Sequence, residues 1–206
     1  MIHENKDEFI KVLGRASKKR GFLLPLIEKD YYLTLILSRI YKLSENLVFK
    51  GGTCLNKVYY VYYRLSEDLD FSMILPQYEA TRGQIDGGQI NCLSLNELIA
   101  EKLRAGAIRK IIAPRDFYDI DFVLRNKFDL TNKEVITLFK KKLQEDDANT
   151  DLGKYKKNLG RSDEEIKDMN SRIETELFDV LAPEERKNFD LSTALKRINK
   201  AMEAIG

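Results

Sequence analysis

The sequence predicts an α+β fold, in which a small mixed sheet flanked by helices precedes a helical C-terminal half. Three observations support this prediction. Leu47–Lys50 is a short apolar run that Gly51 and Gly52 end at once, which is typical of a strand. Residues 68–74 alternate acidic and apolar side chains, the pattern of a half-buried strand. After residue 93, Ser or Thr is repeatedly followed three residues later by Glu, which indicates helix starts.

The composition of the 206 residues is that of a globular protein. Apolar residues make up 43% and charged residues 33% of the chain, which excludes a disordered class. No uninterrupted apolar run approaches the roughly 20 residues of a membrane helix, and the N-terminus lacks the apolar core of a secretory signal. The two cysteines imply no disulfide framework. We therefore expect a cytoplasmic protein with no membrane partner.

Two helices are expected before the first strand. Residues 6–19 are amphipathic and end at Gly21, and Pro25 stands where a second helix begins. That second helix carries a predicted buried stripe at helical spacing, formed by Leu33, Ile36, Leu37 and Ile40.

The sheet region follows. After Leu47–Lys50 we expect a helix over residues 53–63 and a strand over residues 68–74. The polar stretch 76–89 predicts a loop or a hairpin connection, and residues 90–93 a third short strand.

The C-terminal half is expected to be helical, with one polar linker at residues 145–160. Capping boxes predict helix starts at 94–97, 131–134 and 162–165, with ends near Ala107, Gln144 and Leu181. Two further helices are predicted, one over 115–124 after Pro114 and a last one capped by Ser192 that reaches Ala204.

Asp68 and Asp70 are the first candidate site residues. Side chains two apart on a strand share a face, so both carboxylates are expected to point the same way. Two neighbouring carboxylates repel each other unless a cation lies between them, and Mg²⁺ prefers such oxygen ligands, with Mn²⁺ as a substitute. A bare Asp-x-Asp pattern is also compatible with an exposed strand face that carries two unrelated acids.

The neighbours of this pair favour a phosphate site. Gly51 and Gly52 allow a sharp turn and a close approach by a ligand, and Thr53 begins a helix whose free N–H groups suit an anion. Three further side chains could contact a phosphate from this region: Lys57, Arg64 and Ser66. A surface role for Arg64 is equally compatible with its position.

A second group of candidates comes from the later helices. Asp116 and Asp119 are three apart and share a helix face, and Lys102 precedes them in a stretch of five basic residues and no acid that ends at Arg115. A lysine and two acids could hold a triphosphate and orient an attacking hydroxyl. They could equally form a salt bridge, for example between Arg115 and Asp119.

At these residues the chain resembles the nucleotidyltransferase toxins of the AbiEii/AbiGii type, from bacterial type IV toxin–antitoxin and abortive-infection systems. The central segment 49–72 resembles the family motif closely, and residues 27–34, 98–105 and 115–120 resemble its flanking motifs. Together these segments cover about residues 25–125.

The resemblance implies a polymerase-β-like nucleotidyltransferase fold, with a core at residues 1–93 and a helical domain at 94–206 that contributes to the site. It implies Mg²⁺ on Asp68 and Asp70. For the remaining site residues it implies phosphate contacts by Lys57, Ser66 and Lys102, and completion of the site by Asp116 or Asp119. The implied reaction moves a nucleotide from an NTP to an RNA, of which the 3′ end of tRNA is one candidate. A cognate antitoxin is expected.

Two departures from the family pattern leave alternatives open. The connection 76–93 is shorter than expected, and residues 89–93 supply no third carboxylate, the nearest acid being Asp86 in a predicted loop. A non-catalytic nucleotide-binding or RNA-binding protein that retains the pocket is therefore the main alternative. A purely structural helical protein is the other.

Overall fold

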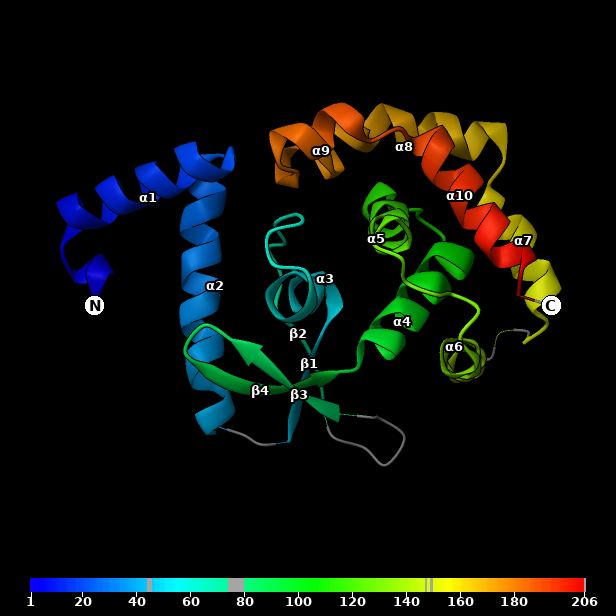
Figure 1. Ribbon diagram of the computed structural model, residues 1–206, viewed down its shortest axis with the longest axis horizontal. Coiled ribbons are helices and arrows are strands. Elements are labelled where there is room, and N and C mark those ends of the chain that lie inside the picture. The colour runs from blue at the N-terminus through cyan, green and yellow to red at the C-terminus, as the bar shows by residue number, and fades with distance from the viewer. Residues whose placement is uncertain (44–45, 74–79, 147, 149, 206) are drawn as a thin grey trace. The chain divides into compact units, whose positions relative to one another are not determined.

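The computed structural model describes residues 1–43, 46–73, 80–146, 148 and 150–205. The α+β prediction is confirmed, since a four-stranded mixed sheet is accompanied by helices (Figure 1). The chain forms two compact units. Unit 1 comprises Met1–Leu93 and Asp179–Lys187, and unit 2 comprises Ser94–Phe178 and Asn188–Gly206. The functional division into 1–93 and 94–206 stays a prediction.

The sheet of unit 1 has the order β2-β1-β4-β3. Its strands are β1 Leu47–Lys50, β2 Asp70–Met73, β3 Ala80–Ile85 and β4 Gly88–Leu93. β1 pairs antiparallel with β2 and parallel with β4, while β3 and β4 form an antiparallel hairpin. β1 is one of the two inner strands, and its Val48 and Phe49 are fully buried.

Of the two expectations for residues 76–89, a loop or a hairpin connection, the described residues show the hairpin. Residues 76–79 lie outside the described residues, and 80–85 form the edge strand β3. β3 is polar because only two of its residues, Gly83 and Ile85, are buried. An edge strand of this kind shows little apolar alternation, so its sequence is similar to that of a loop.

The N-terminal helices of unit 1 are a 3₁₀ turn at Ile2–Glu4, α1 Lys6–Arg20 and α2 Leu24–Leu43. α1 packs Phe9 and Leu13 into a small apolar cluster of unit 1. On α2, Leu33 and Leu37 are buried as predicted, but Ile36 is 48% exposed. The buried stripe predicted for α2 is therefore too wide. α2 buries only part of its apolar side, and Ile36 lies outside the buried part.

The helix after β1 starts earlier and ends sooner than expected. α3 Gly51–Cys54 continues directly into a π-helix, η2 Leu55–Tyr59. It stops at Tyr60 instead of residue 63, because Tyr62 has a left-handed φ of 63° and its N–H donates to the Asn56 side chain. π-Helical turns are rare and occur often at functional sites.

The long helices of unit 2 are α4 Leu95–Ile108, α5 Pro114–Arg125, α6 Lys133–Glu145, α7 Leu152–Gly160, α8 Asp163–Glu176 and α10 Leu191–Glu203. Two shorter elements at the unit boundary are η3 Phe178–Val180 and α9 Pro183–Asn188. Among the described residues, no helix is both long enough and apolar enough to cross a bilayer.

Four expectations for this half need correction, while the capping box of Ser162 and Glu165 is confirmed. The N-caps of α6 and α10 are Asn132 and Asp190, and not Thr131 and Ser192. The side chains of Asn132 and Asp190 accept hydrogen bonds from free backbone N–H groups in the first turn of their helices. α8 ends at Glu176, well before Leu181, since Leu177 leaves helical geometry. The expected linker 145–160 contains α7, whose start is capped by Asp151.

Candidate functional site

The turn after β1 brings one acid onto a glycine. Lys50, the last residue of β1, pairs with Asp70, the first residue of β2. Gly51 follows with φ of 77°, a left-handed conformation that glycine adopts without strain. A Cβ atom at Gly51 would lie 2.2 Å from Oδ2 of Asp70. The Asp70 carboxylate therefore lies directly over the first residue of α3.

Two polar side chains approach the next glycine. A Cβ atom at Gly52 would lie 2.5 Å from Nη2 of Arg64 and 3.1 Å from Oγ of Ser66. Arg64 is only 3% exposed, and its Nη1 donates to the carbonyl of Leu65 at 2.9 Å. The alternative surface role for Arg64 is therefore wrong, and its guanidinium lies at the glycine turn together with Ser66.

Thr53 connects the turn to the second acid, because its hydroxyl donates to the backbone carbonyl of Asp68. Asp68 precedes β2, so the strand expected over 68–74 begins at Asp70, and residue 74 lies outside the described residues. Both acids are exposed. Within the described part of the chain, no ion pair or hydrogen bond reaches either carboxylate, which leaves both charges without a protein counterion.

This donor set fits a hard divalent cation. Asp68 and Asp70 offer carboxylate oxygens beside a turn where phosphates can approach, and Mg²⁺ combines one or two carboxylates with water and substrate phosphates. No group of three or more His, Cys, Asp or Glu that could hold a metal occurs among the described residues. A cation here would therefore depend on the substrate for its remaining ligands.

Lys57 turns towards α2. Its Nζ lies 2.6 Å from Oδ1 of the buried Asp30 and donates to the Thr34 hydroxyl at 2.8 Å. Burial is the main cause that raises the pKa of the nearby Tyr62, and the charge of Asp30 adds to it. Asp30 was not predicted as a site residue. Asp30 could have been identified from the sequence, because it is an acid within segment 27–34, which resembles a flanking motif of the family, and it lies one turn before Thr34.

Buried side chains of α3, η2 and β4 pack behind the glycine turn. Cys54 and Cys92 are both fully buried thiols, and Tyr59 donates its hydroxyl to the Leu93 carbonyl at 2.8 Å. Burial and the neighbouring Cys92 raise the pKa of Tyr59. A hydrogen bond with Cys54 is the main cause that lowers the pKa of the Cys92 thiol. These contacts fix η2 to the sheet and so hold the glycine turn in place.

Unit 2 gathers the other predicted residues. Nζ of Lys102, on α4, lies 2.9 Å from Oδ1 of Asp116 and 2.8 Å from Oδ2 of Asp119, both on α5. Nη1 of Arg109 lies 2.8 Å from Oδ2 of Asp116. The two aspartates are buried, so this cluster is a buried ion-pair network that joins two helices. Arg115 is exposed, and within the described part of the chain no ion pair joins it to Asp119.

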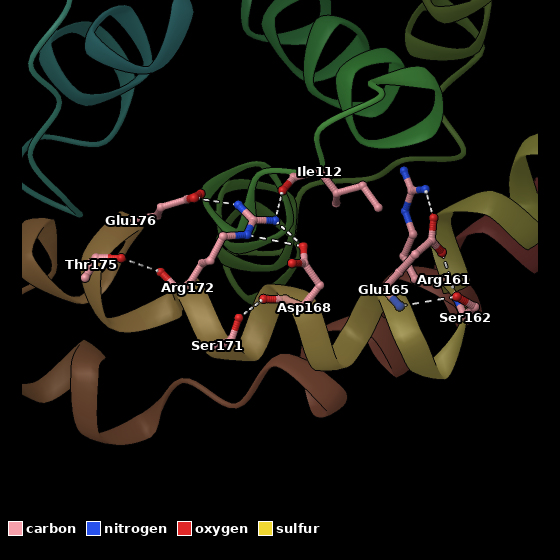
Figure 2. Close-up of polar contacts among 9 residues, drawn as sticks. All are labelled: Ile112, Arg161, Ser162, Glu165, Asp168, Ser171, Arg172, Thr175 and Glu176. Atoms are coloured by element: carbon pink, nitrogen blue, oxygen red, sulfur yellow. Dashed lines mark hydrogen bonds and ion pairs between the residues drawn. The ribbon is translucent and has the colours of Figure 1, made fainter.

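Other charges of unit 2 are paired as well. The stretch from Lys102 to Arg115 was considered as a phosphate-binding cluster, yet Arg104 pairs with Asp146 in addition to the contacts of Lys102 and Arg109. A groove of about 540 Å³ lies between α8 and the loop that precedes α5. At this groove Arg172 pairs with Asp168 and Glu176 and donates to the Ile112 carbonyl (Figure 2).

The structure thus forms two groups from the predicted residues. In unit 1, the glycine turn gathers Gly51, Gly52, Thr53, Arg64, Ser66, Asp68 and Asp70, while Lys57 contacts α2. In unit 2, Lys102 joins Asp116 and Asp119. A glycine turn at a helix start, beside two carboxylates that no described residue pairs, is an arrangement suited to nucleotide chemistry.

Comparison with known proteins identifies the family. The family model "Nucleotidyl transferase AbiEii toxin, Type IV TA system" matches residues 35–89 and 78–204, two segments that overlap in the β3–β4 hairpin. Searches of curated proteins and of solved structures gave no match. The matched segments include all the predicted site residues. The chain therefore belongs to the AbiEii family of nucleotidyl transferase toxins of type IV toxin–antitoxin systems, for which an antitoxin partner is implied.

Proposed function

We propose that the protein is a Mg²⁺-dependent nucleotidyltransferase that moves a nucleotide from an NTP to an RNA acceptor, with the 3′ end of tRNA as the candidate acceptor. One observation carries the proposal. The Asp70 carboxylate lies on Gly51 at the start of α3, where any side chain larger than hydrogen would displace it. This close approach would allow a cation held by the Asp70 carboxylate to contact a phosphate bound at the glycine turn.

The residues of unit 1 would bind and orient the triphosphate. Its oxygens would accept hydrogen bonds from free N–H groups at the start of α3 and from Ser66 and Arg64. Asp68 and Asp70 would hold Mg²⁺, which when bound supplies charge neutralisation and activates the acceptor hydroxyl. The hydroxyl oxygen would form a bond to the α-phosphorus, and the bond from that phosphorus to pyrophosphate would break.

The residues of unit 2 would contribute a cation. Lys102 is held by Asp116 and Asp119 in a fixed position, since both aspartates are buried and both accept from its ammonium. Within unit 2, Lys102 would be the residue that contacts a phosphate, and the two acids would position it. The net negative charge of one lysine with two aspartates is formally balanced by Arg109.

A transfer assay tests the proposal. The protein is incubated with Mg²⁺, each of four labelled NTPs and total tRNA, and label on RNA is measured. Asp70→Asn should lower transfer by about 100-fold or more, because it removes a charge that holds the cation. The matched control Asp179→Asn removes an exposed acid elsewhere in unit 1 and should leave transfer unchanged. Equal transfer by the Asp70 variant and the wild type would refute the assignment.

The same assay separates the alternative function. The described residues contain no third carboxylate beside Asp68 and Asp70, which favours a protein that binds nucleotide or RNA without turnover. Such a protein would show a Mg²⁺-dependent thermal shift with an NTP and would incorporate no label with any of the four nucleotides. Incorporation of label would exclude it.

A further inference from the structure

The outer face of α1 carries a run of basic residues. Between Phe9 and Phe22 the chain has five basic residues and no acid. Four of them share one side of the helix and define the α1 basic face: Lys11, Arg15, Lys18 and Lys19. At 3.6 residues per turn they lie within an arc of about 100°, and they extend over about 12 Å of helix. All four are exposed.

These four charges have no partner in the protein. Within residues 1–43, 46–73 and the other described ranges, no ion pair or hydrogen bond reaches any of the four side chains. Basic residues are common in the last turn of a helix, where they stabilise the helix dipole, and this accounts for Lys18 and Lys19. It does not account for Lys11 and Arg15, which lie further from the C-terminal end of α1.

The opposite side of α1 is already occupied. Phe9 and Leu13 are buried in the apolar cluster with Phe22, Ile27 and Leu65, and Gly21 caps the helix in a left-handed conformation. α1 therefore has no continuous apolar face left for a bilayer or for a peptide groove, and it presents its basic side from a fixed position. An exposed basic face without an adjoining apolar face is expected to bind a polyanion and not a membrane surface.

Two other cations of unit 1 lie apart from the α1 basic face. Arg20, the last residue of α1, lies about 100° around the helix from Lys19. Its guanidinium lies 3.4 Å from the centre of the Tyr62 ring, and Tyr62 packs against the apolar cluster on the opposite side of α1. Nζ of Lys57, on η2, lies 5.7 Å from the same ring centre and is paired with Asp30. The α1 basic face therefore consists of its four exposed side chains alone.

We propose that the α1 basic face binds the phosphate backbone of the acceptor RNA; this inference rests on the proposed function. Lysines and arginines on one helix face contact successive phosphates without reading sequence. An acidic protein would also be attracted, but the proposed function requires an RNA acceptor, and the α1 basic face belongs to the same unit as the glycine turn. Binding is expected to be strongly salt-dependent.

A binding experiment without turnover tests the inference. The probe is fluorescein-labelled total tRNA, titrated with the full-length protein at several salt concentrations without NTP or Mg²⁺. The variant Lys11→Gln/Arg15→Gln/Lys18→Gln should raise Kd at least tenfold at low salt. The slope of log K against log salt should fall by about 2–3, since each lost phosphate contact removes about 0.7–0.9. Anionic vesicles and polyglutamate serve as alternative polyanions.

A matched variant controls for net charge. Lys133→Gln/Lys140→Gln/Lys167→Gln removes three exposed lysines of unit 2 and should change Kd less than twofold. Equal weakening by both variants, an unchanged salt slope, or stronger binding to vesicles or polyglutamate than to tRNA would overturn the inference. The binding assay measures no transfer, so the two proposals are tested separately. Weaker tRNA binding by the α1 variant, but not by the unit 2 variant, supports the α1 inference. Absence of label transfer contradicts the proposed function and leaves the result of the binding assay unchanged.

Discussion

The buried ion-pair networks of unit 2 and the glycine turn of unit 1 differ in how their charges are compensated. In unit 2 the buried charges are paired, as shown by Lys142, which is 2% exposed and contacts Glu97 at 2.7 Å, and by the pairs of Lys102. In unit 1 the carboxylates of Asp68 and Asp70 and the α1 basic face have no partner among the described residues. Charges that are paired within a protein stabilise its fold, whereas unpaired exposed charges are available to ligands.

This difference indicates how to separate structural from functional charges in the family. A lysine between two buried aspartates, such as Lys102, serves a structural purpose whether or not it also contacts substrate, because removing it leaves two buried charges. Asp70 has no such structural purpose. The substitutions below test the difference by measuring stability and transfer separately.

The largest effect on stability is expected at Lys142. Its ammonium also lies 3.5 Å from Glu101 and 3.7 Å from Glu145, so Lys142→Ala leaves the buried Glu97 carboxylate among other acids without a counterion. We expect a loss of about 3–5 kcal/mol in the free energy of unfolding, measured by denaturant titration. Lys142→Met with Glu97→Gln should recover much of it, since the buried charge is then absent. A loss below 1 kcal/mol for Lys142→Ala would show that the cluster is hydrated.

The pH dependence of this cluster has a definite sign. Burial lowers the pKa of Lys142, but the hydrogen bond with Glu97 and the charges of Glu101 and Glu97 outweigh it, and the pKa is raised. A raised folded-state pKa gives stability that is fully present below about 10.5 and is lost as the pH rises through the folded-state pKa. Wild type should therefore lose more stability above pH 10.5 than Lys142→Met does.

Gly51→Ala, in unit 1, is expected to cause the next largest loss of stability. The new Cβ would lie 2.2 Å from the Asp70 carboxylate, and the residue would keep a φ of 77°. We expect about 1–2 kcal/mol of destabilisation from the left-handed conformation, together with a loss of transfer about as large as that of Asp70→Asn. Thermal unfolding and the tRNA labelling assay measure the two effects.

Gly14→Ala provides the control of opposite sign. Gly14 lies in the interior of α1 and has no atom within 4 Å of its Cβ position. Alanine there should stabilise the protein by about 0.5–1 kcal/mol, because glycine weakens a helix interior. Transfer should be unchanged. A loss of transfer in this variant would contradict the assignment of the catalytic site to the glycine turn alone.

Much of the fold could be predicted from local signals. β1, the α2 start at Pro25 and the Ser162 capping box each depend on a few adjacent residues, and the structure confirms them. β3 could not be predicted, because an edge strand with two buried residues lacks apolar alternation. The end of the helix after β1 depends on a hydrogen bond from Tyr62 to Asn56, which no local pattern indicates.

The candidate site shows the same limit. The glycine turn and the two acids lie close together in sequence, so their spacing indicated a shared location. Asp30 contacts Lys57 from α2, and this contact depends on how α2 packs, which a single sequence does not disclose. The paired state of Lys102 likewise depends on the packing of α4 against α5. Sequence patterns thus identified the acids, while their counterions required the structure.

A small loss of stability, expected at Arg172, completes the comparison. This side chain pairs with Asp168 and Glu176 on the surface of α8, where the two acids are 60% and 37% exposed. Each exposed pair at this spacing is worth about 0.3–0.5 kcal/mol, so Arg172→Ala should cost about 1 kcal/mol once the contact with the Ile112 carbonyl is included. Salt at 0.5 M should reduce this loss and leave that of Lys142→Ala nearly unchanged, since buried pairs are screened much less. Denaturant titrations at two salt concentrations measure both, and equal salt sensitivity would contradict the distinction between exposed and buried pairs.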